Sequence, residues 1–159
     1  MLFRSLKGFV AISRGMTVKT IAQFLAQHQR PLHGVSPQST VREALILMAE
    51  KNIGALLVLE GTQLVGMFSE RDYARKVVLH GKTSVETKVR DIMTTDVITM
   101  AKDQSIMECM QTMTDHHIRH LPVLDASHVI GLISIGDVVR EVLEQQSETI
   151  EQLKSYIAS

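Results

Sequence analysis

The chain has 159 residues, of which 45% are hydrophobic and 4% aromatic, and it contains no tryptophan. This length is enough for one compact domain, and the composition predicts an aliphatic core and argues against a disordered chain. Seventeen basic and seventeen acidic residues give a formal net charge of zero. Nucleic acid is therefore not expected as the main partner, because binding to a phosphate backbone needs an excess of positive charge.

The N-terminal stretch, residues 1–34, is basic and contains no acidic residue. Such a start is compatible with an organelle transit peptide. We favour a disordered leader over residues 1–16, followed by a helix that begins near Thr17 and a connection up to residue 34. The expected location is then the cytoplasm, with a mitochondrial or plastid matrix as the alternative if the leader is a transit peptide. The basic residues are Arg4, Lys7, Arg14, Lys19 and Arg30, and the first acidic residue is Glu43.

The main feature of the sequence is an internal duplication, in which residues 35–73 align with residues 100–138 without a gap. Most aligned pairs conserve chemical character, and nine are identical. A duplication of this kind predicts one supersecondary unit that occurs twice. The identical pairs are Glu43/Glu108, Met48/Met113, Ile53/Ile118, Leu56/Leu121, Val58/Val123, Leu59/Leu124, Gly66/Gly131, Ser69/Ser134 and Asp72/Asp137.

Each copy predicts the same order of elements. A capping box, Thr40 with Glu43 and Ser105 with Glu108, starts a helix with apolar residues at helical spacing. Two short runs rich in Val and Leu follow and are separated by a polar turn, which predicts a β-hairpin. The expected elements are helices ending near residues 51–53 and 116–118, first strands at 55–59 and 121–124, second strands at 64–69 and 129–134, and second helices over 70–79 and from residue 135 onward.

This order predicts an α/β (α+β) fold made of two βαββα repeats. One such unit cannot cover both faces of its small sheet, so we expect the two repeats to pack face to face with pseudo-twofold symmetry. The predicted boundaries are a first repeat over residues 35–80, a linker over 81–96 with a short helical turn near 89–93, and a second repeat over 97–159.

The last helix is expected to extend from about residue 136 to residue 156, beyond its counterpart in the first repeat. Two explanations for its additional apolar stripe remain open: a homodimer contact, or packing against the chain's own N-terminal helix near residues 21–25. The stripe consists of Val138, Val142, Ile150, Leu153 and Ile157.

Each repeat contains the motif Gly-x-x-Ser-x-x-Asp, at residues 66–72 and 131–137, where a strand ends and a helix begins. The N-terminus of a helix suits an anion, and an Asp carboxylate one turn further can accept hydrogen bonds from a vicinal diol such as that of ribose. Ser-x-x-Asp is equally an ordinary helix cap. Two points favour ligand binding: Asp reaches back less well than the Glu of the other caps, and the Gly suggests a close approach of the backbone to another group.

These two motifs, together with residues 69–73, 91–94 and 118–123, resemble the bacterial and organellar family of small proteins that consist of one pair of CBS (cystathionine-β-synthase-type) domains, also called a Bateman module. The resemblance covers about residues 17–157. It implies clefts between the repeats that bind an adenosine-containing ligand: AMP, ADP, ATP, NAD or S-adenosylmethionine. It also implies a regulatory sensor that reports ligand occupancy to a regulated partner protein or through its own homodimer.

The resemblance also implies roles for individual residues. The ribose contacts correspond to Ser69, Asp72, Ser134 and Asp137. The adenine contacts correspond to Val35, Ile53 and Ala55 in one cleft and to Ile98, Ile118 and Pro122 in the other. The phosphate contacts correspond to Arg71, Arg119 and His120.

The two clefts are expected to differ. Residues 119–120 are Arg-His where the first repeat has Gly-Ala at residues 54–55, and Gly136 stands where the first repeat has Arg71. Because a guanidinium is a forked donor suited to phosphate, we expect the cleft of Asp137 to be the better nucleotide site.

Metal binding and catalysis are not expected. The histidines at residues 116, 117, 120 and 128 lack a carboxylate or cysteine at convincing spacing for zinc, so no metal is predicted. Cys109, the only cysteine, aligns with Ala44 on an apolar helix face and is expected to be a buried core residue. No run reaches the roughly 18 apolar residues of a membrane helix. The alternatives to a sensor are a purely structural homodimer and a redox-linked or nucleotide-converting enzyme.

Overall fold

The computed structural model describes residues 19–158, so the predicted leader over residues 1–16 and the start of a helix near Thr17 lie outside the described residues. Two compact units make up this part of the chain. Unit 1 contains residues 19–29, 100–121 and 133–158, and unit 2 contains residues 30–99 and 122–132.

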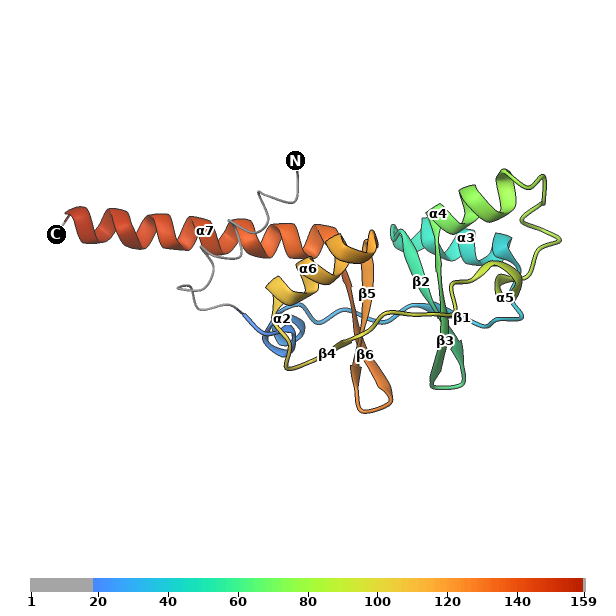
Figure 1. Ribbon diagram of the computed structural model, residues 1–159, viewed down its shortest axis with the longest axis horizontal. Coiled ribbons are helices and arrows are strands. Elements are labelled where there is room, and N and C mark those ends of the chain that lie inside the picture. Colours follow the sequence, from blue (N-terminus) through green and yellow to red (C-terminus); the bar gives the residue numbers. More distant parts are fainter. Residues whose placement is uncertain (1–18, 159) are drawn as a thin grey trace. The chain divides into compact units, whose positions relative to one another are not determined.

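The predicted order of strand, helix, strand, strand, helix is confirmed in both repeats (Figure 1). The first repeat consists of β1 (Gly34–Val35), α3 (Val41–Lys51), β2 (Ala55–Glu60), β3 (Gln63–Ser69), α4 (Glu70–Asp72) and the π-helix η1 (Tyr73–Val78), and α5 (Val89–Ile92) follows it. The helix α2 (Ile21–Gln27) precedes the first repeat. The second repeat consists of β4 (Met100–Ala101), α6 (Ile106–His116), β5 (His120–Asp125), β6 (His128–Ser134) and α7 (Ile135–Ala158).

Each repeat forms a three-stranded sheet, in the order β1-β2-β3 and β4-β5-β6. In the first sheet β1 is parallel to β2, and β2 is antiparallel to β3 with Ala55 opposite Ser69. This register brings the start of β2 next to the end of β3, where the Ser-x-x-Asp motif begins.

The strand β2 is buried on both of its faces, which explains why residues 55–58 form an uninterrupted apolar run. Leu56 and Val58 point into a cluster that includes Phe68 and residues of α3 and α5. Ala55, Leu57 and Met67 form a second cluster on the other face. Apolar side chains that pack on this second cluster include Val129 and Leu132 of β6, which belong to unit 2 as well.

The short helix α2 is attached to the second repeat by backbone hydrogen bonds. Ile21 donates to the carbonyl of Gln104 at 2.8 Å, and Ile106 donates to the carbonyl of Lys19 at 3.1 Å. Thr20 caps α2 through a capping box with Gln23, a signal that the sequence analysis missed. The helix α2 therefore begins at Ile21.

The helix α5 makes the same attachment to the first repeat. Val89 donates to the carbonyl of Ser39, and Val41 donates to the carbonyl of Thr87, both at 2.9 Å. The pairing of Thr40 with Lys88 corresponds to that of Thr20 with Ser105. The duplication therefore extends beyond its visible sequence repeat, because α2 and α5 are equivalent lead-in helices.

The second helix of the first repeat departs from the continuous α-helix expected over residues 70–79. After Asp72 the turns widen into η1, and Leu79 donates to the carbonyl of Ala74 at 3.2 Å, a five-residue step. The widened turns accompany the complete burial of Val77 in the core of unit 2.

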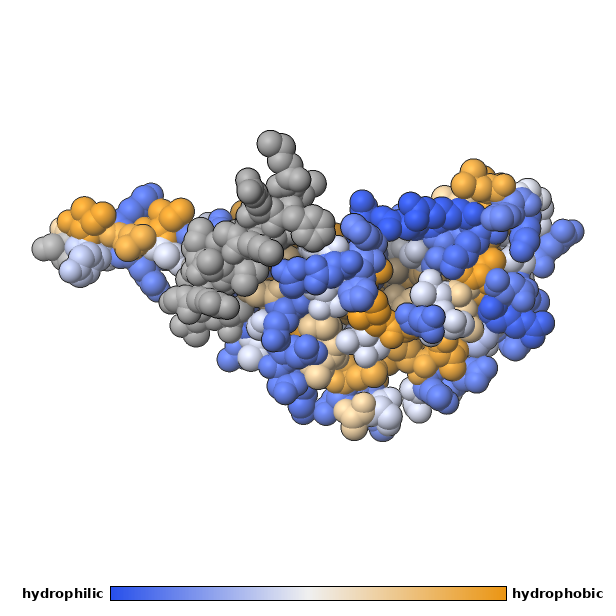
Figure 2. All heavy atoms as spheres, viewed as in Figure 1, coloured by the Kyte–Doolittle hydropathy of each residue, from blue (hydrophilic) through white to orange (hydrophobic). Residues whose placement is uncertain are grey.

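The C-terminal helix α7 packs along α6 and then continues beyond it within unit 1 (Figure 1). Val138 is fully buried, whereas Ile150, Leu153 and Ile157 are 52%, 56% and 82% exposed. Figure 2 shows apolar side chains at the free end of this helix. Packing within the chain thus accounts for the start of the predicted stripe but not for its end. None of the helices described over residues 19–158 has the length and apolar character of a membrane-spanning segment.

One buried ion pair connects α7 to the N-terminal segment. The carboxylate of Glu141, whose side chain is 2% exposed, contacts the ammonium of Lys19 at 2.5 Å, and His28 Nε2 lies 4.0 Å from its other oxygen. A carboxylate this deeply buried needs its cation, because desolvation of an unpaired charge is expensive.

Cys109 is fully buried on α6, as predicted. Burial, and secondarily the negative charge of Asp137, raise the pKa of its thiol to about 12. The thiolate is the nucleophilic form of cysteine, so this side chain stays protonated and unreactive at neutral pH.

The substitution Lys19→Ala leaves the carboxylate of Glu141 buried without its ammonium partner. We expect the free energy of unfolding, measured by chemical denaturation, to fall by about 3 kcal/mol. The control is Lys154→Ala, which removes the exposed pair with Glu151 at 3.6 Å and should change stability by less than about 0.5 kcal/mol. Similar losses in the two variants would contradict a special role for the buried pair.

Native protein at about pH 8.5, where an exposed cysteine is half ionised, should not take up iodoacetamide, because the pKa of Cys109 lies far above this pH. Mass spectrometry of the intact chain gives the extent of alkylation. Protein unfolded in guanidinium chloride is the control and should be fully alkylated. Equal alkylation rates in native and unfolded protein would show that Cys109 is accessible.

Candidate functional site

In the second repeat, Ser134 and Asp137 form a reciprocal pair at the junction of β6 and α7. The backbone N–H of Asp137 donates to Ser134 Oγ at 3.2 Å, and the backbone N–H of Ser134 donates to Asp137 Oδ2 at 2.8 Å. Asp137 is 4% exposed. The capping role that the sequence left open is therefore present at this motif.

The first repeat has the same arrangement at the junction of β3 and α4. Asp72 N–H donates to Ser69 Oγ at 3.2 Å, and Ser69 N–H donates to Asp72 Oδ2 at 3.0 Å. The hydroxyl of Ser69 also donates a hydrogen bond to the same oxygen, at 3.1 Å. Both motifs thus use one carboxylate oxygen, Oδ2, to close the cap.

Of the two sequence arguments for ligand binding at these motifs, the one from side-chain length is wrong, and the close approach inferred from glycine is explained at Gly66 without a ligand. Asp137 and Asp72 close their caps at 2.8 and 3.0 Å, the distances that the longer Glu108 and Glu43 also give, so side-chain length does not distinguish a ligand-binding motif from a cap. The close approach at Gly66 is to the chain itself: a Cβ there would lie 2.7 Å from the sulfur of Met93.

The second carboxylate oxygen, Oδ1, contacts a cation of the same helix in each repeat. Arg140 Nη2 lies 2.8 Å from Asp137 Oδ1, and Lys76 Nζ lies 3.0 Å from Asp72 Oδ1. Lys76 also donates to the carbonyl of Ile92 at 3.0 Å. Neither cation was predicted from the sequence, although their spacing of three and four residues from Asp is the spacing of neighbours on a helix face.

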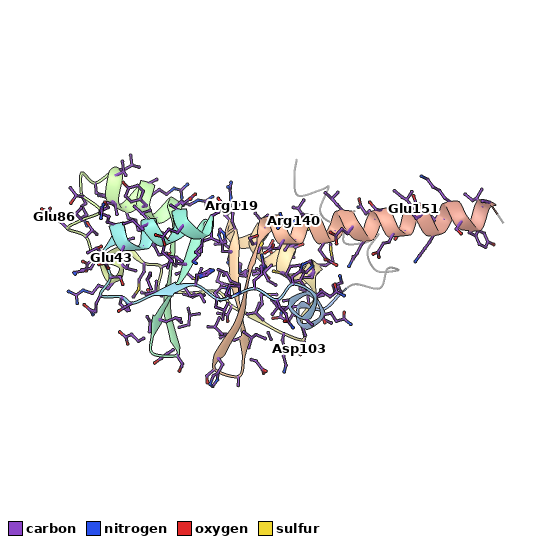
Figure 3. The ribbon with its side chains drawn as sticks, turned by 180° about the vertical axis from the view of Figure 1, so that it is seen from behind. Glu43, Glu86, Asp103, Arg119, Arg140 and Glu151 are labelled. Carbon is purple, nitrogen blue, oxygen red and sulfur yellow. The ribbon has the colours of Figure 1, made fainter. Side chains whose placement is uncertain are left out.

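A backbone hydrogen bond brings the segment before β5 to the start of α7. The N–H of Ile135 donates to the carbonyl of Arg119 at 2.9 Å, so Arg119 lies beside the motif of Ser134 and Asp137 although 15 residues separate Arg119 from Ser134 in sequence. Figure 3 labels Arg119 and Arg140 in this part of the molecule. The first repeat makes the equivalent bond from Glu70 to the carbonyl of Gly54 at 3.2 Å.

The remaining predicted ligand contacts fall into two groups. Ile118, Arg119 and His120 belong to unit 1 with Ser134 and Asp137, whereas Ile98 and Pro122 belong to unit 2. The contacts predicted for the other cleft all belong to unit 2. Val35 and Ile53 pack against the core cluster of Phe68, and Ala55 is 1% exposed among Leu57 and Met67. Arg71 is exposed and lies in sequence between Ser69 and Asp72.

The histidines do not form a metal site within the part of the chain that the structure describes. Over residues 19–158 no three side chains among His, Cys, Asp and Glu come together in a way that could hold a metal ion. The groups that gather at the two motifs are hydroxyl, carboxylate and cationic side chains, which suit a polar organic ligand with hydroxyl and anionic groups.

Two segments of the chain, residues 28–79 and 89–144, match the family model of the CBS domain. The CBS domain-containing protein CBSX3, mitochondrial, of Arabidopsis thaliana is 43% identical over 123 residues, which cover 74% of this chain. The matched region spans 60% of that protein's length.

Solved structures are similar to the chain as well. A protein with CBS domains from Burkholderia ambifaria MC40-6 has 49% identity and a TM-score of 0.77, covering 80% of this chain and 96% of that one. The CBS domain pair of protein MJ0100, solved in complex with 5′-methylthioadenosine and S-adenosyl-L-methionine, has 24% identity and a TM-score of 0.69, covering 78% of this chain and 95% of that one. The second likeness concerns the fold alone. With two matching segments and the predicted repeat architecture in place, the chain belongs to the CBS-domain family and carries a tandem pair of its domains.

Proposed function

We propose that this chain is a regulatory module that binds an adenosine-containing ligand, such as AMP, ADP, ATP, NAD or S-adenosylmethionine, and passes ligand occupancy to a partner protein or to its own dimer. The observation that carries the proposal is the gathering of Ser134, Asp137, Arg119 and Arg140 at the start of α7. Support comes from the MJ0100 domain pair, which binds two adenosine compounds.

The ribose of the ligand is proposed to bind Asp137 through Oδ1, since Oδ2 is committed to the cap. The ion pair with Arg140 is the contact that a ribose hydroxyl replaces. Because the side chain of Arg140 is 68% exposed, this cation can leave without losing buried packing. Ser134 supplies a hydroxyl contact, Arg119 and His120 the phosphate contacts, and Ile98, Ile118 and Pro122 the adenine contacts.

The same roles are proposed for the first motif, where we expect the ligand to bind more weakly. Asp72 is more exposed than Asp137, at 13% against 4% of the side chain, and its cation Lys76 is held by a second acceptor, the Ile92 carbonyl. Hydrogen bonds to a charged group are stronger where water is excluded. Ser69, Asp72 and Arg71 would contact ribose and phosphate there, with Val35, Ile53 and Ala55 near adenine.

The second candidate function is a purely structural homodimer, and the completed caps at both motifs favour it. A cap explains Ser134 and Asp137 without any ligand. A nucleotide-converting or redox-linked enzyme has less support, because the buried, protonated thiol of Cys109 is a poor nucleophile.

Placement in the cell and repeat boundaries belong to the same proposal. We place the module in the cytoplasm, or in an organelle matrix if residues 1–16 are a transit peptide. The repeats are proposed to span residues 35–80 and 97–159, joined by residues 81–96.

Titration calorimetry with AMP, ATP, NAD and S-adenosylmethionine tests ligand binding. The variant Asp137→Ala should bind the tightest of these ligands with about 10- to 100-fold lower affinity, since hydrogen bonds to a charged group contribute about 1.5–3 kcal/mol. Glu108→Ala is the matched control: it removes the same kind of cap from α6 of the same repeat, and it should retain wild-type affinity. Thermal melting of both variants shows that each remains folded.

Absence of binding by the wild type would favour the structural homodimer. An equal loss of affinity in Asp137→Ala and Glu108→Ala would mean that capping, and not ligand contact, explains the effect. Conversion of the bound ligand, detected by chromatography after the titration, would favour an enzyme.

The proposed dimer uses an exposed seam of α7 that contains Ile150, Leu153 and Ile157 of the predicted stripe, together with Val139 and Leu143, which are 44% and 56% exposed. Its apolar residues follow the alternating steps of four and three that pack helices into coiled coils, with Gln146 as the one polar position. The positions of this seam are Val139, Leu143, Gln146, Ile150, Leu153 and Ile157.

Light scattering after size exclusion should give about twice the chain mass of 17.7 kDa for the wild type. The variant Leu153→Glu should shift the protein towards the monomer, because it places a charge in the seam. Gln152→Glu adds the same charge beside the seam and should stay dimeric. A monomeric wild type, or equal behaviour of the two variants, would contradict this interface.

A further inference from the structure

We propose that Arg140 makes the second motif selective for ligands that carry an anionic group such as a phosphate. This inference rests on the proposed function and adds a residue that the family resemblance did not supply. Arg140 lies on α7 one turn beyond Asp137 (Figure 3).

The guanidinium of Arg140 covers the second residue of α7, Gly136. A Cβ placed on Gly136 would lie 3.6 Å from Arg140 Nη1 and 3.6 Å from Ser134 Oγ. With Nη2 on Asp137 at 2.8 Å, the cation therefore lies over the two groups that are proposed to hold the ribose. A phosphate attached to that ribose comes within reach of the same guanidinium.

The first repeat places its positive charge differently. There the second helical residue is Arg71, which carries a guanidinium at the position that Gly136 leaves without a side chain. In the second repeat the guanidinium of Arg140 takes this place from one turn further along the helix. The two motifs thus each have an arginine at the helix start, although the aligned residues are Arg71 and Gly136.

Lys76 cannot replace Arg140 in this role. Its ammonium contacts both Asp72 and the carbonyl of Ile92, so moving it breaks two contacts. Arg140 is more exposed, at 68% against 43%, and its guanidinium has five N–H donors in a planar fork, of which Nη2 serves Asp137. Once displaced from Asp137, such a fork can hold a phosphate through two parallel hydrogen bonds.

Selectivity follows from what happens to the ion pair on binding. A ribose hydroxyl that binds Asp137 Oδ1 displaces Arg140. A ligand without an anionic group provides no new partner for the displaced guanidinium. A phosphate provides a new partner for the displaced guanidinium. Phosphorylated ligands should therefore bind more tightly than neutral adenosine compounds of similar size.

Calorimetry with two probes, AMP and 5′-methylthioadenosine, tests this role. The second probe keeps the adenosine and lacks the phosphate. Arg140→Gln should lower the affinity for AMP about 10- to 100-fold, the loss typical of a charge-assisted contact. It should leave the affinity for 5′-methylthioadenosine unchanged or raise it. Arg140→Lys keeps the charge but not the forked donor. Its affinity for AMP should lie between those of the wild type and Arg140→Gln.

The matched control is Arg75→Gln, because Arg75 aligns with Arg140 in the duplication and is exposed. It should bind both probes like the wild type. A parallel loss for both probes in Arg140→Gln, or no change for AMP, would overturn the role of Arg140 while the proposed function stands. If the wild type binds neither probe nor any other adenosine ligand, the proposed function fails first and this inference with it.

Discussion

The constraint on which the structure depends is the burial of β2 on both of its faces. Residues 55–58 are all buried, and each Leu or Val among them contributes about 1.5–3 kcal/mol. Helices α3 and α5 can cover only the face of Leu56 and Val58. The opposite face needs Val129 and Leu132, which the duplicated unit supplies. A single βαββα unit would lack Val129 and Leu132 and would leave this face more exposed to water.

The candidate site follows from the same arrangement. Antiparallel pairing of β2 with β3 ends at Ser69, and the chain must turn there into a helix whose first N–H groups need acceptors. Asp72 and Asp137 meet this need with one oxygen each. The other oxygen is not required by the cap and is held by a cation. The fold thus leaves one oxygen of a positioned carboxylate available for exchange between a cation and a ligand.

The sequence predicted the parts of the fold that depend on local chemistry. Capping boxes and apolar runs identified α3, α6 and both hairpins, because caps are made by neighbours three residues apart. The widened helix η1 could not be predicted in this way, since its turns depend on tertiary contacts of Val77 and Lys76. The equivalence of α2 and α5 was hidden as well, because backbone hydrogen bonds maintain it and these need no particular side chains.

The site was predicted only in part, for a similar reason. Ser134, Asp137 and Arg119 were identified through the family motif, and backbone hydrogen bonding does bring them together. Arg140 was missed because the duplication aligns it with Arg75, whereas the contact that it makes corresponds to that of Lys76. The cation lies four residues beyond Asp72 but three residues beyond Asp137, a difference that alignment of the two repeats cannot reveal.

The partner of Asp137 is also determined by the residue one turn beyond it. Lys76 follows Asp72 by four residues, but the corresponding residue of the second repeat is Glu141, which adds a second negative charge on the same helix face. The burial of Glu141 is tolerated because Lys19 neutralises it, which leaves Arg140 as the cation of Asp137. The N-terminal segment and the candidate site are therefore coupled electrostatically. Loss of Lys19 would leave the negative charge of Glu141 without its ammonium partner one turn beyond Asp137, and this charge would alter the field in which a ligand competes with Arg140 for Asp137.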